Sequence, residues 1–483
     1  MNKRDTDIES VLRSTFGVEE FRTSQKEIIY RALSGGHSLV LMPTGMGKSL
    51  CYQLPSQITR GLTLVISPLI ALMKDQVDQL LGLGIDAAFI NSSLSGRERE
   101  QRYRALREGR YSILFVSPER FRKKEFTDAI AGREISLLAL DEAHCVSQWG
   151  NDFRPDYSRI REFRQILGNP VTMALTATAT KRVQDDIIAK TGIDPSDMAV
   201  FNEGVCRPNL SLEVHETIDE PEKFESILGL LRGAKGGVIV YFSLIKSLER
   251  FAAYLDMKDT RYRMYHGKLG AEQRRKVQQE FIRPGDSLMI ATNAFGMGID
   301  RPDIRMIIHA EVPDSVESYY QEIGRAGRDG KDSRCVLFYS QEDLAVQMSF
   351  LEWRNPDAGF IRNTHRLMEK MGESVNSYTY EELQEELVHK NRGDHRLQTV
   401  LNILDLNGVT TGSLESGTLR LVSELPDELV SEEIIRSKMD SDRQRLVDMV
   451  GYVREPVCRR NYIHDYFGMN PVDCGNCDLC DGE

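Results

Sequence analysis

The sequence predicts an α/β protein that contains two parallel sheets in series, followed by a helical segment and a small metal-binding module. Three observations carry this prediction. Short apolar runs recur with helical stretches between them, the same pattern restarts near the middle of the chain, and four cysteines gather near the end. Near-continuous apolar strands of about four to eight residues are typical of parallel sheets that are buried on both faces.

The apolar runs place the strands of the two sheets. The first half has runs at residues 38–42, 62–67, 112–117, 136–140 and 171–175. The pattern restarts at residues 236–243 and continues at 287–292, 304–309 and 334–340. Because strands that alternate with helical stretches indicate βαβ units, each half is expected to be one α/β domain. We expect the boundary near residues 203–210, where RPNLSLEV reads as the strand that crosses into the second half.

From about residue 345 the chain becomes helical and acidic. The segments YTYEELQEELV and HRLQTVLNILDLNGV predict two helices, and GTLRLVSEL predicts a strand pair. A winged helix has this order of elements, but so do small helical bundles and plain α+β spacers. A winged helix would suit DNA contact, although the segment lacks a clear basic stripe. The sequence leaves these alternatives open.

Composition and charge argue against several classes of protein. The 483 residues carry a net charge of −11 with a pI of about 5.5, which speaks against an indiscriminate, histone-like nucleic-acid binder but allows a locally basic cleft. No apolar run reaches the ~18 residues that span a bilayer, and MNKRDTDIES lacks the apolar core of a signal peptide. We therefore expect a cytoplasmic protein without membrane contact. Eight cysteines in such a chain do not read as a disulfide framework.

MPTGMGKS at residues 42–49 predicts a phosphate-binding loop, because it follows a strand and precedes a helical stretch. Gly45 and Gly47 allow backbone N–H groups to turn toward phosphate, and Lys48 is expected on the β- and γ-phosphates of ATP. Ser49 would offer its hydroxyl to Mg²⁺. The first position is Met42, where the usual pattern has Gly or Ala. The candidate nucleotide contacts in this loop are Thr44, Gly45, Met46, Gly47, Lys48 and Ser49.

Two carboxylates complete the predicted ATP site. Asp141 and Glu142 directly follow the apolar run SLLAL, and the carboxyl end of a parallel strand is where open α/β sheets bind ligands. Asp141 is expected to hold Mg²⁺ through its water shell. Glu142 is expected to orient and deprotonate the attacking water.

Segments in both halves resemble those of superfamily-two helicases, and of the RecQ family in particular. They are FRTSQ (21–25), SPLIALMKDQ (67–76), LTATAT (175–180), YHGKL (265–269), ATNAFGMGIDRPDIRMIIH (291–309) and QEIGRAGRDG (321–330). The resemblance covers roughly residues 10–340 and implies two RecA-like motor domains. It implies that Gln25 reads the adenine edge, with Phe21 and Arg22 around it. Asp300 would contact ribose or position an arginine.

The last of these segments also has a physical interpretation. Arg325 and Arg328 stand three residues apart, on one side of a helical turn. An arginine that reaches across from the second half can neutralise charge on the transferring γ-phosphoryl group only when the cleft is closed. By resemblance, Arg328 is the arginine finger, while Arg325 and Gln321 lie near the phosphates. Thr176 and Thr178 would brace the carboxylates.

Four cysteines near the end of the chain predict a Zn²⁺ site. Cys458 is followed by fifteen residues and then by Cys474, Cys477 and Cys480, so that two C-x₂-C steps overlap. This spacing suits a tetrahedral site with four thiolates, which is a closed shell and therefore structural rather than catalytic. Free thiols or a redox pair are the alternatives, and His464 could substitute as a ligand. The RecQ family carries a similar four-cysteine module.

The arrangement departs from the common RecQ plan. In many members the zinc module follows the second motor domain closely, and a winged helix and a further helical domain (HRDC) come after it. Here residues 343–450 lie between the motor and the cysteines, and Asp-Gly-Glu follows Cys480. We therefore expect both accessory domains to be absent from their usual place. Residues 343–450 are either a relocated winged helix or an unrelated insertion.

Several residues are candidates for DNA contact. The loop SQWGNDFRPDY is too polar, and too broken by glycine and proline, for a core strand or helix, so its rings are expected to stack on bases. Its candidates are Trp149, Phe153 and Arg154, for which core packing of the two rings is the alternative. Candidates outside this loop are Ser67, Lys74, Ser243, His266, Gly267, Thr292 and Asn293.

Asn151 stands in this loop where RecQ relatives usually carry His. An amide can make the hydrogen bonds of an imidazole but cannot titrate. We expect preserved geometry with weaker coupling between DNA binding and ATP hydrolysis.

These interpretations combine into one expectation. Residues 1–205 and 206–342 are the RecA-like motor domains, 343–450 an accessory segment and 451–483 the zinc module. The chain is expected to be a monomeric, ATP-dependent DNA helicase that acts on single-stranded and tailed or forked duplex DNA in recombination, repair and replication, with the 3′→5′ polarity that the resemblance implies. The alternatives are an RNA helicase, and a DNA-binding or annealing protein whose ATP hydrolysis is only a conformational switch.

Overall fold

The computed structural model describes residues 3–147, 155–296, 299, 301–387, 396–414 and 416–480. The chain divides into two compact units. The first comprises Met1–Glu311, Val316–Tyr339 and Tyr452–Glu483, and the second comprises Val312–Ser315 and Ser340–Gly451. Among the described residues, no helix is long and apolar enough to cross a membrane.

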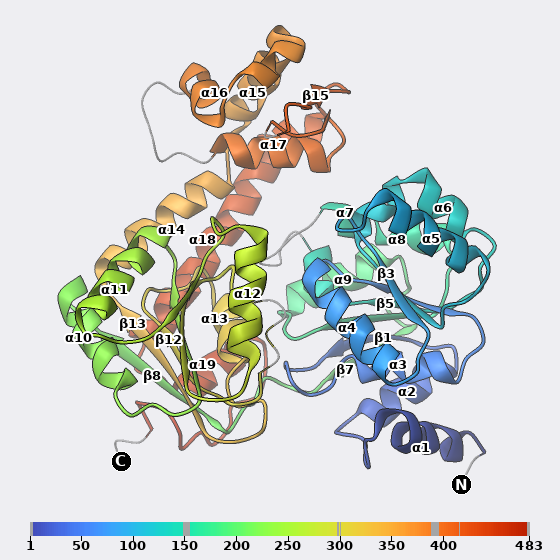
Figure 1. Cartoon of the computed structure of the whole chain (residues 1–483), viewed down its shortest axis with the longest axis horizontal. Coiled ribbons are helices and arrows are strands. Elements are labelled where there is room, and N and C mark those ends of the chain that lie inside the picture. Colours follow the sequence, from blue (N-terminus) through green and yellow to red (C-terminus); the bar gives the residue numbers. More distant parts are fainter. Residues whose placement is uncertain are drawn as a thin grey trace. The chain divides into compact units, whose positions relative to one another are not determined.

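The first sheet lies in the first half of the chain (Figure 1). Its strands are β1 (His37–Leu41), β2 (Leu62–Ile66), β3 (Ala87–Ile90), β4 (Ile113–Val116), β5 (Ile135–Leu140), β6 (Thr172–Thr176) and β7 (Met198–Asn202). Within the described residues the order is β3-β4-β2-β5-β6-β1-β7, and every pairing is parallel. The prediction of a parallel sheet from the apolar runs is therefore confirmed.

Both faces of the first sheet are buried, as its apolar strands require. Leu39 and Leu41 of β1 belong to one hydrophobic cluster, whereas Val40 and Met42 belong to another. Successive side chains of a strand point to opposite faces, so the two clusters lie on the two sides of the sheet. The helices around it are α1 (Lys3–Phe16), α2 (Gln25–Leu33), α3 (Leu50–Gln53), η1 (Pro55–Gln57), α4 (Ile70–Gly82), α5 (Gly96–Arg107), η2 (Pro118–Arg122), α6 (Lys124–Ile130), η3 (Ala143–Val146), α7 (Pro155–Ser158), α8 (Ile160–Ile166) and α9 (Lys181–Thr191).

The second sheet follows a short linker after β7. Its strands are β8 (Leu210–Glu216), β9 (Gly237–Phe242), β10 (Arg263–Tyr265), β11 (Ser287–Thr292), β12 (Ile304–His309) and β13 (Ser333–Tyr339). In the described part of the chain their order is β10-β11-β9-β12-β13-β8, again with parallel pairings only. Its helices are α10 (Glu220–Leu231), α11 (Ile245–Met257), α12 (Ala271–Ile282) and α13 (Val316–Ile323). The fold class expected from the sequence, two parallel-sheet RecA-like domains in tandem, is thus confirmed.

The C-terminal cysteine module belongs to the same unit as the two sheets and contains α19 (Arg459–Tyr466). The loop of residues 474–480, which we call the knuckle, pairs with the edge strand β8, because Cys477 forms a parallel bridge with Leu212. The N–H of Asp478 donates to the Leu212 carbonyl at 3.0 Å, and the Asp478 carboxylate accepts from the N–H of Val214 at 3.0 Å. The knuckle therefore extends the second sheet beyond its edge.

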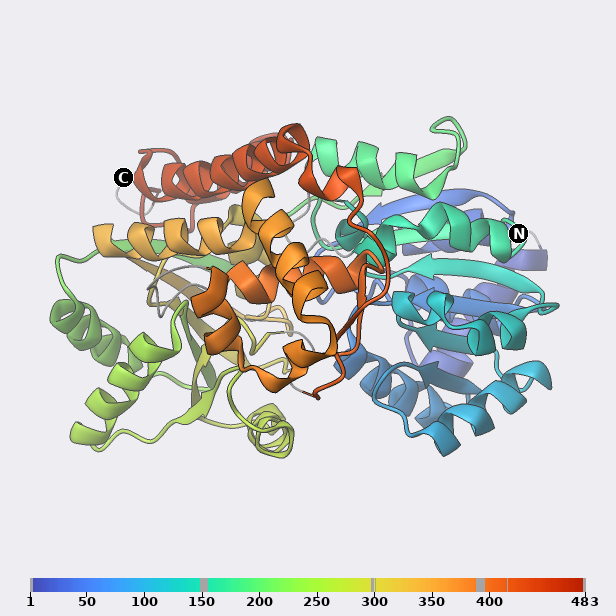
Figure 2. The ribbon, with the colours of Figure 1, turned by 90° about the horizontal axis from the view of Figure 1, so that it is seen from above.

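The second unit is mostly helical, and Figure 2 shows its orange helices gathered together. Two helices and then an antiparallel strand pair occur in the order that the sequence predicts, but β14 lies before the segment 417–425 in which the pair is predicted. Val400 and Leu404 of the second of these helices lie in a core with Phe360, Leu383 and Val409. The elements are α14 (Gln341–Arg354), α15 (Ala358–Met371), η4 (Gly372–Ser377), α16 (Tyr380–Leu387), α17 (Arg396–Leu406), β14 (Thr410–Thr411), β15 (Arg420–Leu421), η5 (Asp427–Val430) and α18 (Glu432–Arg454).

Candidate active site and metal site

The loop of residues 42–49 joins the carboxyl end of β1 to the start of α3. Gly45 and Gly47 have φ angles of 87° and 83°, in the left-handed region that favours glycine. A Cβ atom at Gly47 would lie 2.7 Å from Nε2 of Gln25, so this position also lacks room for a side chain. Position 47 therefore requires glycine for two reasons, its positive φ and the lack of room for a Cβ atom.

The segment that contains Phe21, Arg22 and Gln25 contacts this loop directly. The buried Gln25 amide donates from Nε2 to the carbonyls of Met46 (3.0 Å) and Gly47 (3.1 Å), and its Oε1 accepts from the N–H of Arg22 (2.9 Å). The Arg22 guanidinium donates to the Gly45 carbonyl at 3.0 Å. Phe21 is partly buried against a small apolar cluster. Both N–H groups of the Gln25 amide are thus engaged with the loop in this structure.

Asp141 and Glu142 lie at the carboxyl end of β5. The N–H of Asp141 donates to the Ile66 carbonyl at 2.9 Å, and the Ser67 hydroxyl lies 3.4 Å from Asp141 Oδ2. Glu142 has φ 49° and ψ 51°, a left-handed conformation that costs roughly 1–2 kcal/mol for a residue with a Cβ. The two consecutive carboxylates therefore lie in different places, that of Asp141 near the Ser67 hydroxyl and that of Glu142 near His144.

The burial of Asp141 changes its acidity. Burial, together with the neighbouring Glu142 charge, raises the pKa of Asp141 to about 7, while Lys48 opposes the rise. A cation near this carboxylate would favour its ionised form. The site is therefore electrostatically suited to a positive ligand beside Lys48.

His144 links the carboxylates to the end of β6. Its Nδ1 lies 3.0 Å from the Thr176 hydroxyl and 3.4 Å from Glu142 Oε2. The Thr176 hydroxyl donates to the Thr178 carbonyl at 3.0 Å, so Nδ1 must carry the proton in its contact with Thr176. The pair of threonines thus fixes the orientation of the His144 ring beside Glu142.

These groups border one cavity of about 540 Å³ to which both α/β halves contribute. From the first half, the predicted residues that line it are Arg22, Thr44, Gly45, Gly47, Lys48, Ser49, Asp141 and Glu142. From the second half they are Gln321, Arg325 and Arg328. Met46, Phe21 and Gln25 lie outside the lining, and Asp300 lies outside the described residues.

The two arginines lie after α13 rather than within it, in a segment that we call the arginine turn (residues 324–328). Gly327 has a φ of 54°, and Gly324 precedes the first arginine, so the helix ends before them. The Arg325 guanidinium donates to the Gly296 carbonyl. The side chain of Arg328 packs near Gly45, since a Cβ atom on that glycine would lie 3.5 Å from Arg328 Cγ.

The candidates for DNA contact fall into three groups. Trp149, Phe153 and Arg154, together with Asn151, lie outside the described residues. In the first half, Ser67 is buried beside Asp141, and Lys74 is exposed on α4. The remaining candidates end or directly follow neighbouring strands of the second sheet: Ser243, His266, Gly267, Thr292 and Asn293.

The strand register brings this last group to one edge of the second sheet. β11 pairs with β9 so that Thr292 stands opposite Phe242, and with β10 so that Ala291 stands opposite Tyr265. The residues that follow these strand ends therefore lie side by side. His266 and Thr292 are buried, whereas Asn293 is exposed.

Tyr157 is a residue that the sequence did not single out for the site. Its ring is fully buried, and its hydroxyl lies 2.6 Å from the Ile66 carbonyl and 2.9 Å from the Asp141 carbonyl. It thereby joins the ends of β2 and β5 directly behind Asp141. The last aromatic residue of the stretch 149–157 is thus part of the core, which no pattern in the loop indicated.

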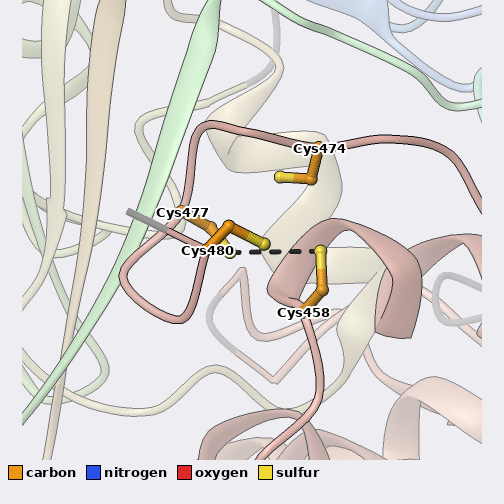
Figure 3. A group of neighbouring side chains, drawn as sticks. All are labelled: Cys458, Cys474, Cys477 and Cys480. Carbon is orange, nitrogen blue, oxygen red and sulfur yellow. Dashed lines mark hydrogen bonds between the residues drawn. The ribbon is translucent and has the colours of Figure 1, made fainter. Parts of the chain in front are cut away.

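Four sulfur atoms converge in the C-terminal module (Figure 3). Sγ atoms of Cys458, Cys474, Cys477 and Cys480 all lie within 4.8 Å of one another, and those of Cys458 and Cys477 are 4.0 Å apart. Four thiolates at the ~2.3 Å Zn–S distance of a tetrahedral site are about 3.8 Å apart, so this cluster fits Zn²⁺. The Nδ1 of His464 lies 2.9 Å from the Asn470 carbonyl, outside the cluster.

Comparison with known families agrees with this geometry. The DEAD/DEAH box helicase model matches residues 22–187, the helicase conserved C-terminal domain matches 222–330, and the RecQ zinc-binding model matches 427–481. Among solved structures, the fold is similar to the DUF1998 helicase MrfA bound to DNA (TM-score 0.58, 18% identity, 88% of this chain and 64% of that one). It is also similar to Dbp5 of S. cerevisiae bound to RNA (TM-score 0.56, 16% identity, 71% and 90%). At these identities the likeness concerns the fold.

Curated relatives are much more similar in sequence. The ATP-dependent DNA helicase RecQ of Bacillus subtilis is 43% identical over 71% of this chain and 58% of its own length. RecQ of Haemophilus influenzae is 39% identical over 82% of this chain and 63% of its own length, so the chain spans less than two thirds of either relative. The probable ATP-dependent DNA helicase RecS of B. subtilis is 39% identical over 76% of this chain and 74% of its own length. The RecQ zinc-binding match and these RecQ relatives, together with a relative matched over most of both lengths, show that the chain belongs to the RecQ family of ATP-dependent DNA helicases.

Proposed function

We propose that this protein is an ATP-dependent DNA helicase that moves 3′→5′ along single-stranded DNA and opens duplex DNA during recombination, repair and replication. The observation that carries the proposal is the single cavity lined by Lys48, Asp141 and Glu142 from one α/β half and by Arg325 and Arg328 from the other. A site divided in this way can close on ATP and reopen after hydrolysis. The proposal assigns residues 1–205 and 206–342 to the two motor domains.

The cavity residues divide the chemistry of ATP hydrolysis among them. Lys48 binds the β- and γ-phosphates, and Glu142 orients the attacking water and accepts its proton. Ser49 and Asp141 would hold Mg²⁺, which neutralises phosphate charge when bound. Arg328, with Arg325 and Gln321 beside it, stabilises the charge on the γ-phosphoryl group as the bond to the β-phosphate breaks.

We assign the nucleic-acid path to the loop of residues 147–157 and to the strand ends of the second sheet. Trp149, Phe153 and Arg154 would stack on bases, a contact that every base can make. The edge that bears Ser243, His266 and Asn293 would meet the phosphodiester backbone, as would Lys74. We further propose that the protein acts as a monomer on single-stranded and tailed or forked duplex DNA, and that Zn²⁺ on the four cysteines is structural.

Strand displacement tests the proposal. The protein is mixed with duplexes that carry either a 3′ or a 5′ single-stranded tail, with ATP and Mg²⁺, and Lys48→Ala is the matched control. We expect displacement from the 3′-tailed duplex and none by Lys48→Ala. Displacement that survives Lys48→Ala would refute the mechanism, and ATP hydrolysis without any displacement would favour the conformational-switch alternative. A matched RNA duplex distinguishes an RNA helicase.

A further inference from the structure

The linker between the two sheets carries an arginine whose side chain contacts the arginine turn. Arg207 precedes β8, and its guanidinium donates to the carbonyls of Gly324 (3.3 Å), Ala326 (2.7 Å) and Gly327 (3.0 Å). It also lies 3.5 Å from the Thr44 carbonyl in the phosphate-binding loop. One side chain therefore touches the backbone of two segments that border the cavity, one from each α/β half, and three of its contacts hold the turn from which Arg325 and Arg328 project.

The arginine turn has no regular secondary structure of its own to hold it in place. α13 ends at Ile323, and Gly327 adopts a left-handed φ of 54°. Asn209 adds to the support, since its Nδ2 donates to the carbonyls of Gly327 (3.0 Å) and Lys331 (2.9 Å). A Cβ atom at Gly327 would lie 2.4 Å from this nitrogen, so the turn packs tightly against the linker. The conformation of the turn thus depends on the linker side chains.

The linker is itself anchored from the C-terminal module. Arg460 of α19 is buried and donates to the carbonyls of Arg207 (2.7 Å) and Leu210 (2.8 Å). The Asn476 amide donates to the Pro208 carbonyl at 3.0 Å. The backbone of Arg207 is therefore held on one side while its guanidinium holds the arginine turn on the other.

We propose that Arg207 is a positioning residue for ATP hydrolysis, which fixes the arginine turn so that Arg325 and Arg328 enter the cavity in one arrangement. Arg460 is a second positioning residue, because it fixes the backbone of Arg207. A planar guanidinium with five N–H donors suits several carbonyls at once, and an ammonium does not reproduce this fork. The inference rests on the proposed function, since it takes the cavity to be the ATP site.

The test separates binding of nucleotide from its hydrolysis. Arg207→Met should lower kcat for DNA-stimulated ATP hydrolysis by about 10²-fold, the loss expected when a catalytic group is misplaced by ~1 Å. The Kd of a fluorescent ADP analogue should stay within about threefold, because Lys48 and its loop remain. Arg207→Lys should keep part of the rate. Arg334→Met, which removes an exposed arginine of β13 outside the cavity, is the matched control and should hydrolyse ATP as the parent does.

A double variant distinguishes positioning from general support of the fold. If Arg207 acts through the turn, Arg207→Met should cost less than about threefold further when it is added to Arg328→Ala, measured in single turnovers. An equal loss in both backgrounds would overturn the proposal, and so would an Arg207→Met rate equal to that of Arg334→Met.

Circular dichroism melting shows whether Arg207→Met folds. If it does not, Arg207→Lys and Arg460→Met replace it. A kcat about tenfold lower than that of the parent, with unchanged Kd, supports the proposal. A kcat equal to that of the parent in both variants overturns it. These outcomes are independent of strand displacement. If the unmodified protein hydrolyses ATP but does not open duplexes, the helicase proposal fails, whereas the proposed role of Arg207 in ATP hydrolysis is unaffected.

Discussion

The two sides of the proposed ATP cavity are built differently. On the first side, Lys48 and Ser49 come from one short loop, and Asp141 and Glu142 from one strand end. On the second side, the arginine turn depends on Arg207, which stands 117 to 120 positions before the carbonyls that it holds. A local motif thus shapes one side, while contacts between distant segments shape the other. The difference teaches that a motif can identify catalytic candidates without revealing what keeps them in place.

The largest effect should come from the local side. Glu142→Gln should lower kcat for ATP hydrolysis by about 10³-fold, or about 4 kcal/mol of barrier, because an amide cannot accept the proton of the attacking water. Nucleotide affinity should change little. Phosphate release assays with saturating single-stranded DNA measure the rate. A variant within about threefold of the parent would show that another group is the base.

The next effect concerns the C-terminal module, which anchors the linker that carries Arg207. Cys477→Ser should remove a thiolate and the metal with it, at a cost on the order of 3 kcal/mol in stability, since folding and metal binding are coupled in such modules. Metal content measured with a chromogenic chelator should fall from about one zinc per chain toward zero. Because the knuckle pairs with β8, ATP hydrolysis should fall as well. Cys206→Ser, at an exposed cysteine outside the cluster, is the control and should keep its zinc.

A smaller effect tests a bond between η3 and the end of β6 on this side of the cavity. Thr176→Val removes the hydroxyl beside His144, so the ring loses its orientation near Glu142 and kcat should fall about tenfold, or about 1.4 kcal/mol. Thr63→Val is a fitting control, because the buried Thr63 hydroxyl has no partner among the described residues. Equal rates for the two variants would argue that His144 needs no support from β6.

The smallest effect is a pH dependence next to the linker. His215 and Arg334 hold the pKa of Glu213 on β8 at about 2, below its usual range. A lowered pKa means that the stabilisation is complete above about pH 4.5 and is lost as the pH falls toward 2. Solvent screening keeps it below about 1 kcal/mol. Glu213→Gln should therefore be less stable than the parent at about pH 6 and more nearly equal at about pH 3, by urea unfolding. A gap that does not change with pH would assign no role to the carboxylate.

Much of the fold could be predicted from the sequence, because the strands of a parallel sheet that is buried on both faces consist of nearly continuous apolar residues. The strands without such a signal were not predicted. β7 has one buried residue, Met198, followed by half-buried and exposed ones, and β10 has three residues of which two are half-buried. β3 is short, and its first two residues are alanines. Edge position and short length weaken the apolar pattern in these cases.

The candidate residues of the cavity could be named because they belong to short segments with a characteristic order. The contacts that hold these residues in place could not be predicted. Arg207 lies in a linker without periodicity, and its partners become visible only once β8 and β13 pair. The burial of Tyr157 was equally hidden, since its loop reads as polar and broken. The hydrogen bonds of Gln25 depend on the turn of residues 42–49, which a sequence pattern names but does not orient.

The pairing of the cysteine knuckle with β8 has one more consequence. β8 is the last strand of the second sheet, and a strand with an open edge can pair with another chain. Asn476 and Asp478 occupy the backbone groups of Leu212 and Val214 along that edge, since the Asn476 carbonyl accepts from the N–H of Leu212 and Asp478 bonds to both residues. The C-terminal module therefore covers a strand edge that could otherwise pair with another chain and lead to aggregation. Removing the metal should lead to association of chains through β8 while the helices are still folded, which light scattering would detect before circular dichroism changes.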